Sequence, residues 1–278
     1  MFGADSSPTR RAVLAATAGG LSAGGLRSVD RVGASSGIVL RVRIYPDERL
    51  GWGPTARDVH RHMGRAFEWL QAVADERLDR TVHVRVEKGS TVPRKSLDFD
   101  TEKRLYRSFR AWLDETDAPE GPVSHLFLAD APFDPGLGYG IANTHVRGGG
   151  RLGAQAIANV GATEVWDDRT VTRNMAIHEV LHTIIRDRDA RAVNASGCEH
   201  DLGAVVGETP DRVFVTPLAT SYAGASGGDE TTWHGTGCYH HDRFSRYDVH
   251  PDLETTWHHT WVPSDATCEA VVRYLREW

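Results

Sequence analysis

Residues 168–186 read DRTVTRNMAIHEVLHTIIR and carry the strongest structural signal in the chain. Apolar side chains recur in this stretch at helical spacing and on more than one side, which predicts a largely buried helix. Asp168 or Thr170 can cap its start. His178 and His182 are four residues apart, so they project from one face of the helix, one turn apart. Because unpaired polar groups are costly to bury, these side chains need a partner.

The segment HEVLH, residues 178–182, predicts a catalytic zinc site. Its spacing lets both imidazoles reach one Zn²⁺ at about 2.0–2.1 Å. Glu179 flanks the metal without binding it, and it can take a proton from zinc-bound water and return it to a leaving amine. Zinc lowers the pKa of that water to about 7 and polarises the scissile carbonyl. We therefore predict a zinc hydrolase with His178 and His182 as ligands and Glu179 as general base.

The chain before this helix alternates between strand and helix patterns. Residues 37–45 and 81–87 alternate in polarity and residues 123–129 are apolar, which predicts three strands. Residues 54–78 and 101–116 carry apolar side chains at helical spacing. This order predicts an α/β (α+β) fold in which helices pack on a mixed sheet.

A glycine-rich region follows, with two short apolar pieces at 139–146 and 154–160. They predict either a surface loop pair or a hairpin at a sheet edge, where a peptide can add as a further strand. Beyond residue 189 the chain shows little periodicity, and it ends in a predicted helix over 265–278.

A catalytic zinc usually takes a third protein ligand. The sequence resembles the metzincin zinc peptidases, whose motif continues as HExxHxxGxxH, although Ile185 and Arg188 stand at the glycine and third-histidine positions here. Residues 198–203, CEHDLG, resemble the family's return to the metal after an insertion over about 187–197. The resemblance implies His200 as third ligand. The alternatives are Glu199 or Glu208 in a gluzincin arrangement, Asp201 in an aspzincin arrangement, and His240 or His241.

The resemblance extends over about residues 37–222. The element order resembles the metzincin N-terminal subdomain, in which an edge strand aligns the substrate, and residues 139–160 occupy the matching place. Residues 215–222, VTPLATSY, resemble the family's turn beneath the metal, with Thr220 where methionine is expected. The resemblance implies that Tyr222 stabilises the oxyanion, and a core aromatic is the alternative reading.

The N-terminus predicts export. Arg10 and Arg11 precede an Ala/Gly/Leu-rich run, which resembles a twin-arginine signal peptide and which we assign to residues 1–33. Export places the protein where disulfides persist. The three cysteines permit one bridge, either Cys238 with Cys268 or Cys198 with Cys238.

Composition narrows the function classes. The 278 residues carry a net charge of -6, so no basic surface indicates nucleic acid. No long apolar stretch outside the leader predicts a membrane span. The acidic pairs Asp167–Asp168 and Asp229–Glu230 match no known calcium loop, so structural Ca²⁺ is a weaker expectation than zinc. The remaining histidines lie among aromatic residues after 230 and are typical of packing or a substrate subsite.

These observations predict a secreted, monomeric zinc endopeptidase that acts on peptides or proteins. Its α/β subdomain spans residues 34–188 and ends in the HEVLH helix, and an irregular subdomain spans 189–278. Two alternatives share the site: a zinc-dependent amidase acting on a non-peptide substrate, and a non-catalytic zinc-binding protein.

Overall fold

The first of the two sheets in the part of the chain that the structure describes is five-stranded and mixed. The computed structural model describes residues 37–116, 118–163, 169–195, 198–220, 245–249 and 256–278. The strand order is β2-β1-β3-β5-β4. The first four run parallel, and β4 pairs antiparallel with β5 at the edge. The strands are β1 (Ile38–Pro46), β2 (Val82–Lys88), β3 (Val123–Ala129), β4 (Gly140–Ala142) and β5 (Ala154–Asn159).

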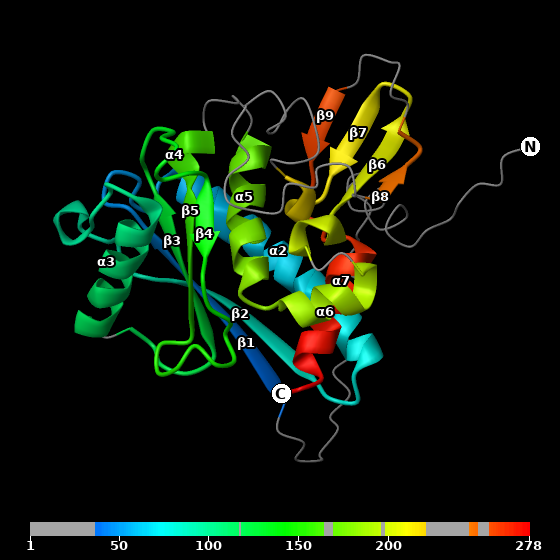
Figure 1. The fold of residues 1–278 in the computed structure, drawn as a ribbon, viewed down its shortest axis with the longest axis horizontal. Coiled ribbons are helices and arrows are strands. Elements are labelled where there is room, and N and C mark those ends of the chain that lie inside the picture. Colours follow the sequence, from blue (N-terminus) through cyan, green and yellow to red (C-terminus); the bar gives the residue numbers. More distant parts are fainter. Residues whose placement is uncertain (1–36, 117, 164–168, 196–197, 221–244, 250–255) are drawn as a thin grey trace, which may run out of the picture.

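Helices cover both faces of this sheet. α2 (Pro54–Arg77) and α5 (Arg169–His182) pack on one face, and α3 (Glu102–Glu115) packs on the other, as Figure 1 shows. A short helix, α4 (Val160–Thr163), follows β5, and a 3-10 turn, η1 (Arg94–Ser96), precedes α3. β3 is buried along its whole length because both of its faces meet helices. Its two-sided apolar sequence is the pattern that such a strand requires.

The predicted order of strands and helices in this half is confirmed. The hairpin over residues 139–160 is confirmed as well, since β4 and β5 pair antiparallel and β4 lies at the edge of the sheet. The glycines of the connecting loop are needed for its backbone, because Gly148 and Gly150 have φ angles of 107° and 74°. Residues with a Cβ rarely adopt such angles.

The HEVLH helix ends at His182, four residues before the predicted end. The amides of Thr183 and Ile184 donate to carbonyls three residues back, at Val180 and Leu181, so the last turn tightens. The Thr183 hydroxyl also donates to the Val180 carbonyl. A new helix, α6 (Asp187–Asn194), then starts in a different direction. The sequence did not reveal this break because Ile184 and Ile185 continue the apolar pattern.

The C-terminal half contains a second, four-stranded sheet of order β8-β6-β7-β9. Its strands are β6 (Ala204–Thr209), β7 (Arg212–Val215), β8 (Ser245–Tyr247) and β9 (Thr256–His259). Two 3-10 turns, η3 (Glu199–Leu202) and η4 (Pro217–Ala219), flank β6 and β7. The terminal helix α7 (Asp265–Leu275) is confirmed. The prediction of an irregular C-terminal part is therefore incomplete, whereas the division at residue 188 stays a prediction.

α5 lies between the two halves of the molecule. It contacts β3, β4 and β5 on one side and β9 and η4 on the other (Figure 1). The amide of Asn174 on α5 donates to the Thr260 carbonyl over 2.8 Å and ties the helix to the C-terminal half. The HEVLH segment is therefore held from both sides.

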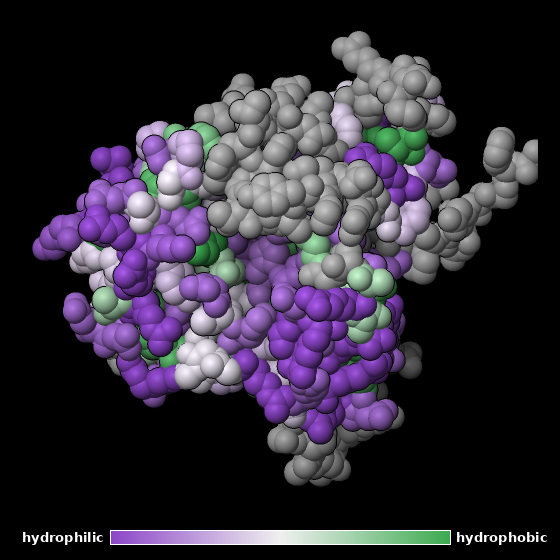
Figure 2. All heavy atoms as spheres, viewed as in Figure 1, coloured by the Kyte–Doolittle hydropathy of each residue, from purple (hydrophilic) through white to green (hydrophobic). Residues whose placement is uncertain are grey.

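On the face seen in Figure 2 the described surface is mostly hydrophilic, with hydrophobic side chains in small separate patches.

Several predictions concern residues outside the described ranges. These are the leader at 1–33, Tyr222, His240, His241, Cys238 and both acidic pairs. Among the described residues, Cys268 is a free thiol buried in α7, and burial raises its pKa to about 12. The pairing of Cys238 with Cys268 is therefore wrong, and the pairing of Cys198 with Cys238 stays a prediction. None of the described helices is both long and apolar enough to span a bilayer.

Candidate metal centre

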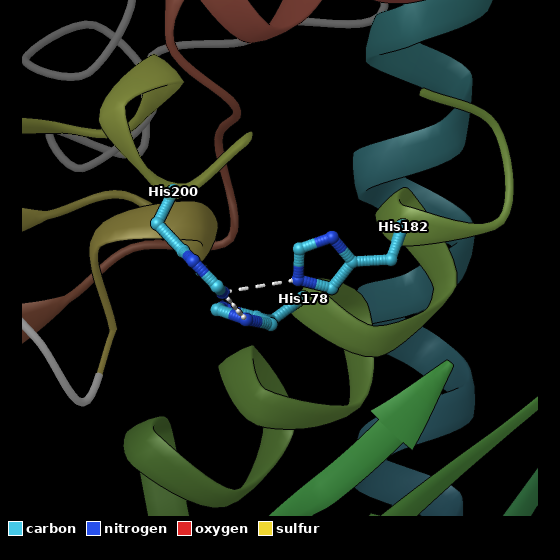
Figure 3. A group of neighbouring side chains, drawn as sticks. All are labelled: His178, His182 and His200. Carbon is cyan, nitrogen blue, oxygen red and sulfur yellow. Dashed lines mark hydrogen bonds between the residues drawn. The ribbon is translucent and has the colours of Figure 1, made fainter. Parts of the chain in front are cut away.

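Three imidazoles converge on one point between the two halves of the molecule. His178 and His182 come from α5 and His200 from η3, and Figure 3 shows their rings facing one another. Nε2 of His200 lies 3.1 Å from Nε2 of His178 and 3.2 Å from Nε2 of His182. His178 is 2% exposed and His200 9% exposed. The sequence placed His178 and His182 together by spacing, whereas only the fold brings His200 to them.

The far side of two of these rings is held by groups that only accept hydrogen bonds. Nδ1–H of His178 donates to the Pro217 carbonyl over 3.0 Å. Nδ1–H of His182 donates to the Glu199 carboxylate. Since a neutral imidazole carries one proton, both Nε2 atoms are left with lone pairs that face the shared point. Nδ1 of His200 lies 3.5 Å from Cys198 Sγ, so its Nε2 also faces inward.

The spacing of the three nitrogens fits one cation. Ligands on a tetrahedral ion at 2.0–2.1 Å stand about 3.3–3.4 Å apart, close to the separations given above. Such an ion satisfies all three lone pairs at once, and neutral imidazole is a common ligand for transition metals. The described residues thus include a three-histidine site that can hold a metal ion.

Glu179 lies beside this site and against the edge strand. It is 5% exposed, and burial raises its pKa to about 7, partly opposed by nearby His182. A carboxyl group with that pKa can both accept and release a proton at neutral pH. A Cβ on Gly140 of β4 would lie 2.5 Å from Glu179 Oε1. Only glycine therefore lets the edge strand approach the carboxylate this closely.

The two histidines of α5 differ in their affinity for protons. Burial lowers the pKa of His178 to about 3, so this ring is neutral and able to bind metal over the physiological range. Burial also opposes charge on His182, but the adjacent Glu199 carboxylate outweighs it and raises the pKa of His182. A metal ion at the site must therefore compete with a proton for His182 more than for His178.

The alternative third ligands among the described residues lie elsewhere. Glu199 contacts the Nδ1 side of His182, away from the shared point. Glu208 pairs with Arg212 in the second sheet, 3.0 Å away. Asp201 is buried, and neither of its carboxylate oxygens has a hydrogen-bond partner among the described residues. None of these carboxylates belongs to the three-histidine group.

Sequence reasoning missed three features of the site: the Pro217 carbonyl, the contact of Glu199 with His182, and the close approach of Gly140. A backbone carbonyl leaves no trace in side-chain patterns, so the Pro217 contact could not have been found. The glycine-rich edge and the adjacency of Glu199 to His200 were visible in the sequence. Their meaning depended on which elements lie side by side in the fold.

Fold and site together define an α+β protein with a buried three-histidine site that can hold a metal ion. No protein-family model matches the chain, and no curated protein sequence matches it. Among solved structures it is similar to metalloproteinase-II from Bacteroides fragilis, with 15% identity over 55% of this chain and a TM-score of 0.37. The match covers 44% of that protein, so the chain spans less than half its length. A likeness this distant carries no argument about function.

Proposed function

We propose that this protein is a zinc-dependent endopeptidase exported from the cell. The observation that carries the proposal is the convergence of three imidazole Nε2 atoms beside the buried carboxylate of Glu179. Three histidines leave the fourth position of a tetrahedral ion open, which is the arrangement of catalytic rather than structural zinc sites. The leader over residues 1–33 supports export. We propose that the protein acts as a monomer and that its partners are peptide or protein substrates.

The residues divide the work among them. His178, His182 and His200 hold the ion. When bound, zinc supplies water with a pKa near 7 and polarises the scissile carbonyl. Glu179 accepts the proton of the attacking water and donates it to the leaving amine, and its raised pKa suits both steps. Tyr222, implied by the metzincin resemblance, is proposed to stabilise the oxyanion.

The edge of the first sheet supports a peptide as the substrate. β4 is a short antiparallel edge strand, and Gly140 brings its backbone against Glu179. An extended peptide can pair with such an edge through main-chain hydrogen bonds, whatever its side chains. Its scissile bond then lies near the carboxylate. A substrate bound in this way is recognised chiefly by its backbone, which is the chemistry of a peptidase.

The proposal is tested by Glu179→Ala in the mature chain. Zinc content should equal that of the unaltered protein, since Glu179 is not a ligand. Hydrolysis of a generic protein substrate should fall about 10²–10⁴-fold, as expected for loss of a general base. Zinc is measured by elemental analysis and hydrolysis by release of fluorescent peptides. Glu208→Ala is the matched control, because Glu208 pairs with Arg212 away from the site.

Three results would contradict the proposal. The first is full activity in Glu179→Ala, and the second is activity in unaltered protein that survives removal of zinc by a chelator. In the third, zinc-loaded unaltered protein leaves proteins intact but cleaves small amides, which would indicate a non-peptide amidase.

A further inference from the structure

The turn η3 presents two adjacent side chains to the same site in different ways. Nε2 of His200 faces the shared point of the three imidazoles. The carboxylate of the preceding residue, Glu199, accepts a hydrogen bond from Nδ1–H of His182. One short turn thus touches the metal site twice, once at the centre and once behind a ligand from another element.

His182 is the ligand that most needs such support. It is the last residue of α5, and its side chain is 16% exposed, more than the other two rings. His178 lies one turn inside the helix, where the Pro217 carbonyl fixes its ring. At the helix end, Glu199 is the one partner of His182 Nδ1 among the described residues. The Glu199 side chain is itself only 12% exposed, so water competes weakly for this contact.

The geometry excludes Glu199 as a direct ligand in this arrangement. Its oxygen contacts Nδ1 of His182, whereas Nε2 of the same ring faces the other two imidazoles. The two ring nitrogens point in diverging directions, so a group on one side does not reach an ion on the other. A carboxylate that accepts a hydrogen bond from a metal-bound imidazole fixes the tautomer and the orientation of the ring. It also makes the other ring nitrogen a stronger electron-pair donor to the metal.

We propose that Glu199 is a positioning residue of the metal site, which orients His182 through Nδ1 so that Nε2 faces the ion. The inference rests on the metal site of the proposed function. It implies that docking of η3 supplies the third ligand and orients the second in one step. The site is then complete only when the C-terminal half has packed against α5.

The test compares metal binding by Glu199→Ala, Glu199→Gln and the control Glu208→Ala in the full mature chain. Zn²⁺ affinity is measured by competition with a chromophoric chelator, and site geometry by the visible absorption of bound Co²⁺. Glu199→Ala should bind zinc about 10–100-fold more weakly, with an altered Co²⁺ spectrum. Glu199→Gln keeps an acceptor oxygen without the charge, so it should restore the spectrum and lose affinity only a few-fold. Glu208→Ala should match the unaltered protein in both measurements.

Two results would overturn the inference. In one, Glu199→Ala keeps the affinity and the spectrum of the unaltered protein. In the other, Glu199→Ala loses as much affinity as His200→Ala, which would make Glu199 a ligand. If Glu199→Ala does not fold, Glu199→Gln carries the test, and an affinity identical to that of the unaltered protein then contradicts the role. No substrate is used, so failure of the proposed peptidase activity would show separately, as a zinc-loaded protein without hydrolysis.

Discussion

Helix α5 and the turn η3 both contribute histidines to one site, but different forces hold them in place. α5 is fourteen residues long, and apolar side chains on more than one side of the helix belong to the main core. η3 is four residues long, and of its side chains only Leu202 enters that core. α5 therefore carries its ligands at a spacing set by the helix itself. η3 carries its ligand at a place set by its neighbours.

The neighbours of η3 come from distant parts of the chain. The Leu202 carbonyl accepts hydrogen bonds from the hydroxyls of Ser264 and Thr267, at the start of α7. Gly203 packs against η4 so closely that a Cβ there would lie 2.4 Å from the Ala219 amide nitrogen. Two of the three histidines are therefore placed by the geometry of one helix, whereas the third depends on tertiary docking. Substitutions on the two sides should separate these contributions.

The largest effect is expected for the ligands themselves, with His178→Ala compared with His200→Ala. A four-ligand zinc site binds with about 10–16 kcal/mol, so each ligand contributes on the order of 3–4 kcal/mol. Each substitution should therefore weaken zinc binding about 10²–10³-fold in a chelator competition. Equal losses would show that the docked turn contributes as much as the helix.

A replacement elsewhere on the surface controls for this measurement. His83→Ala alters an exposed histidine on β2 and should leave zinc affinity unchanged. If His200→Ala also kept full affinity while His178→Ala lost it, the third ligand would have to come from another residue. His240 and His241, outside the described residues, would then be the first to replace.

The same comparison explains how much could be predicted from the sequence. In the first half, helices of 14 and 24 residues and a fully buried strand repeat their apolar pattern long enough to be recognised. The edge hairpin is one of the two alternatives that the glycine-marked loop allows. Helical spacing and the HExxH motif together predict His178, Glu179 and His182 as site residues.

The second half was harder for a physical reason. β8 has three residues, β7 and β9 have four each, and β6 begins with a buried run rather than an alternation. Windows this short carry no periodicity that separates strand from loop. Only the family resemblance implies His200, and nothing in its local sequence indicates that η3 lies against His182. Such contacts arise from packing between residues far apart in the chain.

A smaller effect, on the pH dependence of stability, is expected from a buried histidine that lies outside the metal site. His125 on β3 is fully buried beside the Tyr45 hydroxyl, 2.9 Å from its Nδ1. Burial lowers its pKa from 6.5 to about 4. Between these values the unfolded chain binds a proton that the folded chain does not, so stability falls as the pH falls. The contribution lost between pH 7 and pH 5 is about 2 kcal/mol.

The measurement is urea unfolding of the metal-free protein at both pH values. His125→Gln should lower the free energy of unfolding at pH 7. Between pH 7 and pH 5, the free energy of unfolding of this variant should fall by about 2 kcal/mol less than that of the unaltered protein. His83→Gln, an exposed position on β2 of the same sheet, should show the full loss. An unchanged pH response in His125→Gln would mean that other groups carry the acid sensitivity of the first half.

The smallest effect compares two helix caps, one in each half. The Thr101 side chain accepts a hydrogen bond from the Arg104 amide at the start of α3. The Ser264 hydroxyl accepts from the Thr267 amide at the start of α7 and also donates to the Leu202 carbonyl of η3. Loss of a cap costs about 1 kcal/mol, and loss of a further buried hydrogen bond about 1 kcal/mol more. Ser264→Ala should therefore cost about 2 kcal/mol and Thr101→Ala about 1 kcal/mol, measured by urea unfolding.

Zinc affinity shows whether a helix cap also helps to position the metal site. Because Ser264 helps to hold η3, Ser264→Ala should also weaken zinc binding a few-fold, whereas Thr101→Ala should leave it unchanged. Thr267→Val removes the second hydroxyl donor to the Leu202 carbonyl and should weaken zinc binding in the same direction. If all three variants kept full zinc affinity, the position of η3 would not depend on α7. The docking contribution would then have to come from η4, where Gly203 meets Ala219.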